Sequence, residues 1–339
     1  MISSLIQYFA QAGQTAISTV TNTNNSVLTA PVFTADFPES VQHTSADSAE
    51  KLGAFAVATF YRLGAKVIGK DFDGCRMEMG RDSRYELKTI ATGDGIHLDT
   101  VCLRGKLKKA VVIAPGIGDR FESLHIPTSL LRHIYELIRE ALGDVTVMSL
   151  NVRGSGFSTG EYTAQRFHID IYSVCQYLVH KKGFDPEEVY IYGESMGGCT
   201  GLRASCLMQR KYPDKKISAI TDRSFLTLTQ VVEERVPEDF REVAVETVRY
   251  VKFDVECHGA AKELKGTILA IGAYNDETVP FETFFGNQQQ IQELPNCEVI
   301  HIQGEDSFPN PHARLFMSTE REDIGQALKK LTEREPTSY

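Results

Sequence analysis

The chain alternates short apolar runs, rich in Val, Ile and Leu, with longer segments in which apolar residues recur at helical spacing. The short runs predict strands over residues 85–92, 96–103, 110–115, 145–150, 189–193, 217–221, 267–272 and 298–303. The longer segments predict helices at about 125–142, 164–181, 196–211, several within 227–264, about 282–293 and 312–333. The first two strands form a predicted antiparallel hairpin through Gly93-Asp94-Gly95. This order predicts an α/β fold, with a mostly parallel sheet and helices on both faces.

The N-terminal part of the chain has a different pattern. Residues 1–13 show helical spacing without the basic flank of a signal peptide, which predicts a short amphipathic helix that docks on the body or on a partner. Residues 14–45 are rich in Ser, Thr, Asn and Pro and predict a loosely ordered lead-in, with a further helix beginning near Ser45 or Ser48. We therefore divide the chain into a helical and polar extension, 1–83, and an α/β domain, 84–339.

Composition narrows the class of partner. Of the 339 residues, 42% are hydrophobic and 24% are charged, as in ordinary soluble globular proteins. The formal charge of −9 is spread without long acidic blocks, which argues against nucleic acid or an anionic membrane as the main partner. Small molecules and proteins remain as the candidate classes of partner. The sequence contains no apolar run of about 18 residues, so no transmembrane segment is predicted.

Cysteine usage bears on the compartment. The chain has seven cysteines, an odd number, and they lack C-x-x-C spacing, so neither a zinc site nor a disulfide framework is predicted. Free cysteines are typical of a reducing compartment, which predicts a cytoplasmic protein.

One predicted strand ends at a serine between two glycines, in the stretch VYIYGESMGG from Val189. In a tight strand-to-helix turn of the G-x-S-x-G type, Gly193 and Gly197 let neighbouring backbone pass close by. The serine hydroxyl then lies at the N-terminus of the next helix, where backbone amides favour a developing negative charge. Ser195 is therefore the candidate nucleophile, although this short pattern also arises by chance.

Two glycine-containing loops follow neighbouring predicted strands. In Pro115-Gly116-Ile117-Gly118 the amide of Ile117 is expected to form an oxyanion hole together with the amide of Met196, which follows the serine. Residues 151–160 contain three glycines and resemble a phosphate loop, but they lack G-K-[ST], so nucleotide binding is not predicted.

An acid and a histidine follow two later strands. Asp276 lies four residues past Gly272, and His312 lies nine residues past Gln303. The chain order of Ser195, Asp276 and His312 is that of a nucleophile, an orienting acid and a general base. Serine needs an imidazole to remove its proton, and the imidazole needs a carboxylate to fix its tautomer.

Other residues compete for these two roles. Glu277 is adjacent to Asp276, and Asp222 ends another predicted strand, so either is an alternative acid. Among the histidines, His301 lies within a strand, while His258 and His125 do not follow a terminal strand. The sequence leaves these alternatives open.

From about residue 85 to 331 the chain resembles the α/β-hydrolase superfamily of serine hydrolases. The resemblance rests on N-x-R-G-x-G-x-S at 151–158, the G-x-S-x-G around Ser195, D-x-x-V-P from Asp276 and the late His312. It implies an eight-stranded sheet, a Ser-Asp-His triad, no metal and no organic cofactor. An insertion at about 223–265 implies a small helical cap. A looser likeness is to hydrolase-like proteins of uncharacterised role in intracellular bacteria of the chlamydial type, which would make the source bacterial. It rests on the P-G-x-G loop, the R-G-x-G-x-S run and the long N-terminal extension.

The chain departs from the common pattern of this superfamily at three places. Pro115 stands where many members have the His of an H-G loop, and Asn151 replaces a frequent Asp. Neither change removes a catalytic group, because the oxyanion donors are backbone amides. The segment GEDSFPNPH, which ends at His312, is longer and more acidic than the short G-G-H that is usual in this superfamily. Of the three triad residues, His312 therefore matches the family pattern least well.

The first functional hypothesis is a serine hydrolase that cleaves a small carboxylic ester or thioester through an acyl-enzyme. A serine peptidase of the same fold is one alternative, and a catalytically silent hydrolase fold, exported as a binding module or effector in a host cell, is another. Charged cap residues such as Glu233, Glu238 and Arg241 predict a polar pocket that prefers short or medium acyl chains. Alternatively, these charges face solvent and the valines between them line an apolar tunnel.

Overall fold

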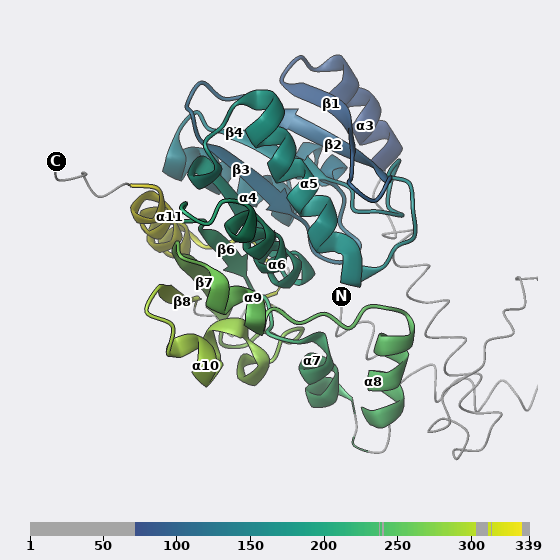
Figure 1. Cartoon of the computed structure of the whole chain (residues 1–339), viewed down its shortest axis with the longest axis vertical. Coiled ribbons are helices and arrows are strands. Elements are labelled where there is room, and N and C mark those ends of the chain that lie inside the picture. The colour runs from purple at the N-terminus through teal and green to yellow at the C-terminus, as the bar shows by residue number, and fades with distance from the viewer. Residues whose placement is uncertain (1–71, 237, 239–240, 303–310, 313, 334–339) are drawn as a thin grey trace, which may run out of the picture.

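A computed structural model of the chain describes residues 72–236, 238, 241–302, 311–312 and 314–333 (Figure 1). The predicted strands are all present: β1 Tyr85–Ala91, β2 His97–Leu103, β3 Ala110–Ala114, β4 Thr146–Leu150, β5 Val189–Glu194, β6 Ala219–Asp222, β7 Ile268–Ala273 and β8 Cys297–Ile302. They form one 8-stranded sheet in the order β1-β2-β4-β3-β5-β6-β7-β8. β2 is antiparallel to both of its neighbours, and the other pairs are parallel. The predicted hairpin and mostly parallel sheet are confirmed, whereas the helices predicted within residues 1–71 lie outside the described residues.

Helices cover both faces of the sheet (Figure 1). On one face lie α5 (Ala164–Lys182) and α6 (Met196–Lys211), and on the other lie α4 (Leu130–Leu142) and α11 (Ser318–Thr332). Strand β3 shows why both faces are covered. Its sequence is AVVIA, and every residue in it is buried. Val112 belongs to the core under α5 and α6, and Val111 to the core under α4 and α11, since successive side chains of a strand point to opposite faces. A strand buried on both faces has the continuous apolar run that predicted it.

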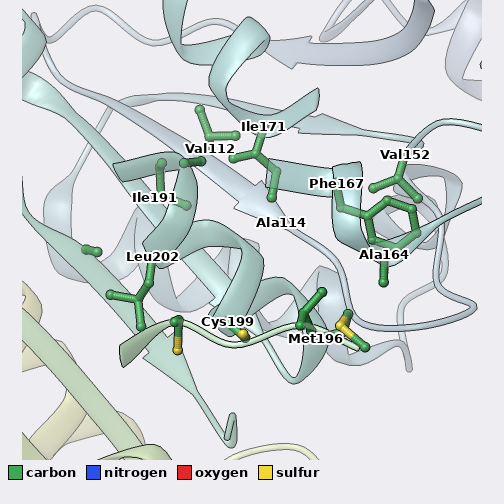
Figure 2. Close-up of a cluster of buried hydrophobic side chains, with 14 of the residues drawn as sticks. Val112, Ala114, Val152, Ala164, Phe167, Ile171, Ile191, Met196, Cys199 and Leu202 are labelled. Atoms are coloured by element: carbon green, nitrogen blue, oxygen red, sulfur yellow. The ribbon is translucent and has the colours of Figure 1, made fainter. Parts of the chain in front are cut away.

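The core under α5 and α6 supports the start of α6. Figure 2 shows part of it, with Val112 and Ile191 of the sheet near Ile171 of α5 and Leu202 of α6. Cys199, in the first turns of α6, is fully buried in the same cluster. The residue after Ser195 therefore begins a helix that is held rigidly against the sheet.

Three helix predictions are partly wrong. The helix predicted over 312–333 begins at Ser318. The helix predicted from residue 125 begins at Leu130, because Ser129 accepts the N–H of Arg132 and caps it. The segment 282–293 is not one helix but two 3₁₀ turns, Phe281–Thr283 and Phe285–Asn287, followed by the four-residue α10, Gln289–Gln292.

The interruption at residues 282–293 has a packing cause. Phe284 and Phe285 are both buried, 2% and 0% exposed. In a continuous helix the two side chains would point about 100° apart around the axis. Phe284 instead takes an extended conformation, and its ring lies against Gly272 and Gly286.

Helix α3 (Phe72–Arg81), which lies before the α/β domain as divided by sequence, packs on the body of that domain. Arg76 donates to both oxygens of Asp99, at 2.6 and 2.8 Å, and to Glu122 at 3.2 Å. Asp99 and Glu122 are only 4% and 2% exposed. The Asn151 amide donates to both carboxylates as well. Arg76 thus supplies the positive charge that two buried carboxylates require.

The insertion between β6 and β7 forms the predicted small helical cap, with helices α7 (Leu228–Arg235), α8 (Arg241–Tyr250) and α9 (His258–Glu263) (Figure 1). Glu233 and Arg241 are exposed, which fits the alternative that the cap charges face solvent. The expected preference for short or medium acyl chains stays a prediction. Val231 and Val248 are buried and pack into the core with Phe253. The cap therefore has a charged outer face and an apolar inner face.

Two further findings concern the cysteines and membrane spans. The seven cysteines are free thiols. Within the ranges that the structure describes, no helix is both long and apolar enough to cross a membrane.

Arg76→Ala is expected to lower the free energy of unfolding by about 3 kcal/mol, because it leaves Asp99 and Glu122 buried without a cation. The measurement is equilibrium unfolding in urea. Arg84→Ala is the matched control, since Arg84 pairs with Asp82 at the surface with 67% of its side chain exposed, and it should leave the midpoint unchanged. Equal effects of the two variants would contradict the importance assigned to Arg76.

Candidate active site

Ser195 stands between β5 and α6 in a backbone conformation that side chains rarely adopt. Its φ is 52° and its ψ is −120°, in a region that strains any residue other than glycine. The Ser195 N–H donates to the carbonyl of Asp222 at 2.9 Å, and the Ser195 carbonyl accepts from the hydroxyl of Ser224 at 2.7 Å. The end of β6 therefore holds the strained turn on both sides.

The two glycines of the G-x-S-x-G pattern are required by close approach of the backbone. A Cβ on Gly193 would lie 2.2 Å from the carbonyl oxygen of Gly197, and a Cβ on Gly197 would lie 2.1 Å from that of Ala114. No side chain fits at those distances. The first turn of α6 is thus pressed against the end of β3, which brings the loop that begins at Pro115 next to Ser195.

This loop offers backbone amides at the serine. Gly118 donates to the hydroxyl of Tyr162 at 3.3 Å, and Asp119 donates to the carbonyl of Gly116 at 3.3 Å, so the far side of the loop is fixed. Within the described part of the chain, neither the amide of Ile117 nor that of Met196 donates to a protein acceptor. These two amides are the predicted oxyanion donors.

His312 bridges Ser195 and Asp276. Its Nε2 lies 3.1 Å from the Oγ of Ser195, and its Nδ1 lies 2.8 Å from the Oδ2 of Asp276. The three side chains follow β5, β7 and β8, and they are 4%, 6% and 5% exposed for Ser195, Asp276 and His312. The structure brings the three candidate residues together in one hydrogen-bonded chain.

Asp276 is held by the turn that follows it. Its second oxygen accepts the N–H groups of Thr278 and Val279 at 2.7 and 2.8 Å. Burial alone would raise the pKa of Asp276, but His312 and these two amides outweigh it and lower the pKa. Arg235 of the cap helix α7 also donates to the Asp276 carbonyl at 2.7 Å. An ionised Asp276 accepts a hydrogen bond from Nδ1–H of His312, which leaves Nε2 unprotonated and facing Ser195.

Arg223 fixes the segment that carries His312. Its side chain is completely buried and pairs with Asp222 through contacts of 2.7 and 2.8 Å. Its Nη1 donates to the carbonyls of Pro311 and Arg314, both at 3.0 Å, which flank the histidine in sequence. The segment at the end of β6 therefore contacts both Ser195 and the His312 loop.

The alternative acids have other surroundings. Asp222 accepts from Arg223 and, at 3.0 Å, from the hydroxyl of Tyr192, so its oxygens are engaged in the core. Glu277 is exposed to solvent.

The alternative histidines also make other contacts. The His301 ring packs against Tyr274, with ring centroids 4.9 Å apart, and burial lowers its pKa. His125 lies 2.6 Å from a carboxylate oxygen of Glu78, and His258 begins helix α9. Of the histidines weighed from the sequence, His312 is the one that contacts Ser195.

The glycine-containing loop at 151–160 is explained by structural contacts. Arg153 in this loop forms a buried ion pair with Asp170 at 2.7 Å and a second contact with Asp94 at 2.9 Å. A Cβ on Gly156 would lie 2.3 Å from the side-chain nitrogen Nδ2 of Asn151. In the described ranges, no group of three His, Cys, Asp or Glu side chains is arranged to hold a metal ion.

Glu194 was not singled out from the sequence as a site residue. One of its carboxylate oxygens lies 3.6 Å from Nε2 of His312. Burial raises the pKa of Glu194 to about 7. The signal in the sequence was an acidic residue at the last position of an otherwise apolar strand.

The fold agrees with comparisons to known proteins. A family model described as the alpha/beta hydrolase fold matches residues 109–246, a range that includes Ile117, Ser195 and Met196 but ends before Asp276 and His312. A solved esterase of Pyrococcus furiosus superposes with a TM-score of 0.56 at 16% identity, over 75% of this chain and 94% of the esterase. The chain has the alpha/beta hydrolase fold.

Two curated relatives are similar in sequence. An uncharacterized protein of Acanthamoeba polyphaga mimivirus is 22% identical over 230 residues, which are 65% of this chain and 74% of that protein. A phosphatidylserine lipase of Mus musculus is 34% identical over 135 residues, or 40% of this chain, and the match spans only 23% of the lipase. The predicted likeness to chlamydial proteins stays a prediction.

Arg223→Met is expected to lower the free energy of unfolding by about 3–5 kcal/mol, because Asp222 would remain buried without its cation. Adding Asp222→Asn should recover at least about 1 kcal/mol, since the amide is neutral and can still bond to Tyr192. The measurement is urea unfolding of the single and double variants. Strictly additive losses would mean that the two charges do not compensate each other.

Proposed function

We propose that the chain is a serine hydrolase that cleaves a carboxylic ester or thioester through a covalent acyl-enzyme. The observation that carries the proposal is the hydrogen-bonded chain from Ser195 through His312 to Asp276. A buried carboxylate that orients an imidazole, which in turn faces a strained serine hydroxyl, is the arrangement that activates a weak nucleophile.

Each step uses a group at the site. Ser195 Oγ attacks the carbonyl carbon of the substrate, and its proton passes to Nε2 of His312. The carbonyl oxygen becomes an oxyanion that the amides of Ile117 and Met196 stabilise, at the N-terminus of α6. His312 then returns the proton to the departing alcohol or thiol. Water repeats the sequence on the acyl-enzyme and frees the acid and Ser195.

The amides of Ile117 and Met196 have no protein acceptor among the described residues, which supports this scheme. Hydrogen-bond donors that have no protein acceptor are ready for a charge that forms only during reaction. The positive end of α6 adds to the same effect. The scheme draws its nucleophile, base and oxyanion donors from the chain itself, so it requires neither a metal nor an organic cofactor.

The comparisons favour an ester over an amide as the substrate. The solved structure cited above is an esterase, and the mouse relative is named a lipase. The triad chemistry itself does not distinguish the two bonds, so a serine peptidase is the alternative enzyme. A silent binding module is the alternative outside enzymes, and the intact chain of hydrogen bonds argues against it. Small-molecule esters, rather than nucleic acids, remain the expected partners.

A fluorophosphonate is expected to modify Ser195, because a hydroxyl that an imidazole activates toward acylation is equally activated toward phosphorylation. Peptide mapping of the labelled protein by mass spectrometry identifies the site, and Ser195→Ala is the control. Absence of labelling in the folded wild-type chain, or labelling that persists in Ser195→Ala, would favour the binding module.

His312→Ala is expected to lower kcat on a p-nitrophenyl ester by about 10⁴-fold or more, to nearly the same extent as Ser195→Ala. The double variant should be hardly worse, because the two residues act as a unit. Asp276→Asn should lose less. His301→Ala is the matched control and should keep normal kcat, and loss of activity there with a normal His312→Ala would show that the base is wrongly assigned.

A further inference from the structure

Glu194 places a second carboxylate at His312. Its Oε1 lies 3.6 Å from Nε2, whereas Asp276 binds the other ring nitrogen, Nδ1. Glu194 is the last residue of β5, and 12% of its side chain is exposed. The ring nitrogen that faces the Ser195 hydroxyl therefore also faces an acidic group that the triad does not contain.

The backbone around Glu194 holds its carboxyl group in place. A Cβ on Gly116 would lie 2.2 Å from Oε2 of Glu194, so the carboxyl group rests directly on the backbone of the loop that carries the Ile117 amide. Among the described residues, no protein donor forms a hydrogen bond with it. A buried carboxyl group without such a donor is costly when ionised, so its presence there calls for a function.

The charges around Glu194 decide when it ionises. Burial raises its pKa to about 7; the nearby cations His312 and Arg223 lower the pKa, and Asp222 and Asp119 raise it. Tyr192, which is bonded to Asp222, also faces it. Asp222 and Arg223 form an ion pair with each other, whereas Nε2 of His312 lies 3.6 Å from Glu194 itself.

We propose that Glu194 is a positioning residue that stabilises the protonated form of His312 during acyl transfer. The proposal rests on the proposed function, because His312 gains its proton from Ser195 in that reaction. An anion 3.6 Å from Nε2 attracts the imidazolium that forms there. The acid limb of the pH-rate profile, which reports loss of the neutral imidazole base, should therefore depend on the charge at Glu194.

A merely structural role makes a different prediction. If Glu194 only fills the space beneath Gly116, the isosteric Glu194→Gln should preserve the pH dependence. If its charge matters, Glu194→Gln removes the anion, and the imidazole then loses its proton at lower pH. The acid limb of kcat/KM should therefore move to lower pH by about one unit. Glu194→Met, which also lacks the charge, serves if the Gln variant does not fold.

The matched control is Glu277→Gln. Glu277 adjoins Asp276 in sequence, but its side chain is exposed, so solvent screens its charge. Removal of this carboxylate should leave the acid limb where it is in the wild-type chain. A shift in Glu194→Gln that Glu277→Gln reproduces would mean that only net charge matters, which would overturn the proposal.

A second readout does not depend on catalysis. The protonation midpoint of the His312 ring is measured by NMR on histidine-labelled protein, with the signal assigned by its loss in His312→Ala. The midpoint should fall in Glu194→Gln and stay unchanged in Glu277→Gln. A fall of this midpoint in a chain that hydrolyses no ester would refute the proposed function but leave the pairing of Glu194 with His312 intact.

The stability of the chain gives a third readout. The pKa of Glu194 is about 7 in the folded chain against an ordinary value of 4.5, so the folded state binds the extra proton between these pH values. Wild-type stability should therefore fall as pH rises through this window, and Glu194→Gln should lack that contribution. Relative to wild type, the urea midpoint of the variant should be higher at pH 8 than at pH 5. An acid limb and an NMR midpoint that both stay at their wild-type values in Glu194→Gln would overturn the proposal.

Discussion

The buried ion pair between Asp222 and Arg223 is the interaction on which the geometry of the site depends. The Asp222 carbonyl accepts the N–H of Ser195, and Arg223 donates to the carbonyls on both sides of His312. Ser195 and His312 are 117 positions apart in the chain, yet their reacting atoms lie 3.1 Å apart. One dipeptide that contacts both segments therefore sets this distance.

The same pair explains how the chain maintains strain at Ser195. A non-glycine residue with a φ of 52° costs of the order of 1–3 kcal/mol, and such a conformation persists only where its surroundings overdetermine it. Here Asp222, Ser224, Gly193 and Gly197 supply those constraints. Because an unpaired charge at Asp222 would be costly in the core, the site geometry and the stability of the fold are coupled.

The strands of the sheet, and the three residues that the structure brings into contact, could be singled out from the sequence because their signals are local. Buried parallel strands read as apolar runs, and Ser195, Asp276 and His312 each follow such a run. The contacts of Arg223 and Glu194 with the His312 segment were missed, because they join segments that are remote in sequence. The helix predicted at 282–293 was wrong because the backbone at Phe284 is extended and its ring packs on Gly272 of β7, a contact between remote segments that periodicity does not reveal. The sequence left open which face of the cap carries its charges, because a single helical segment does not show which of its faces meets the core.

The claim that Ser195 forms a covalent acyl intermediate is tested most directly with p-nitrophenyl dimethylcarbamate, because a carbamoyl-enzyme loses its acyl group slowly. If Ser195 is the nucleophile, the chain should rapidly release about one p-nitrophenolate per molecule. The peptide that contains Ser195 should then carry a dimethylcarbamoyl group. Modification of another side chain would contradict the account. So would a failure to react in a preparation that hydrolyses p-nitrophenyl acetate.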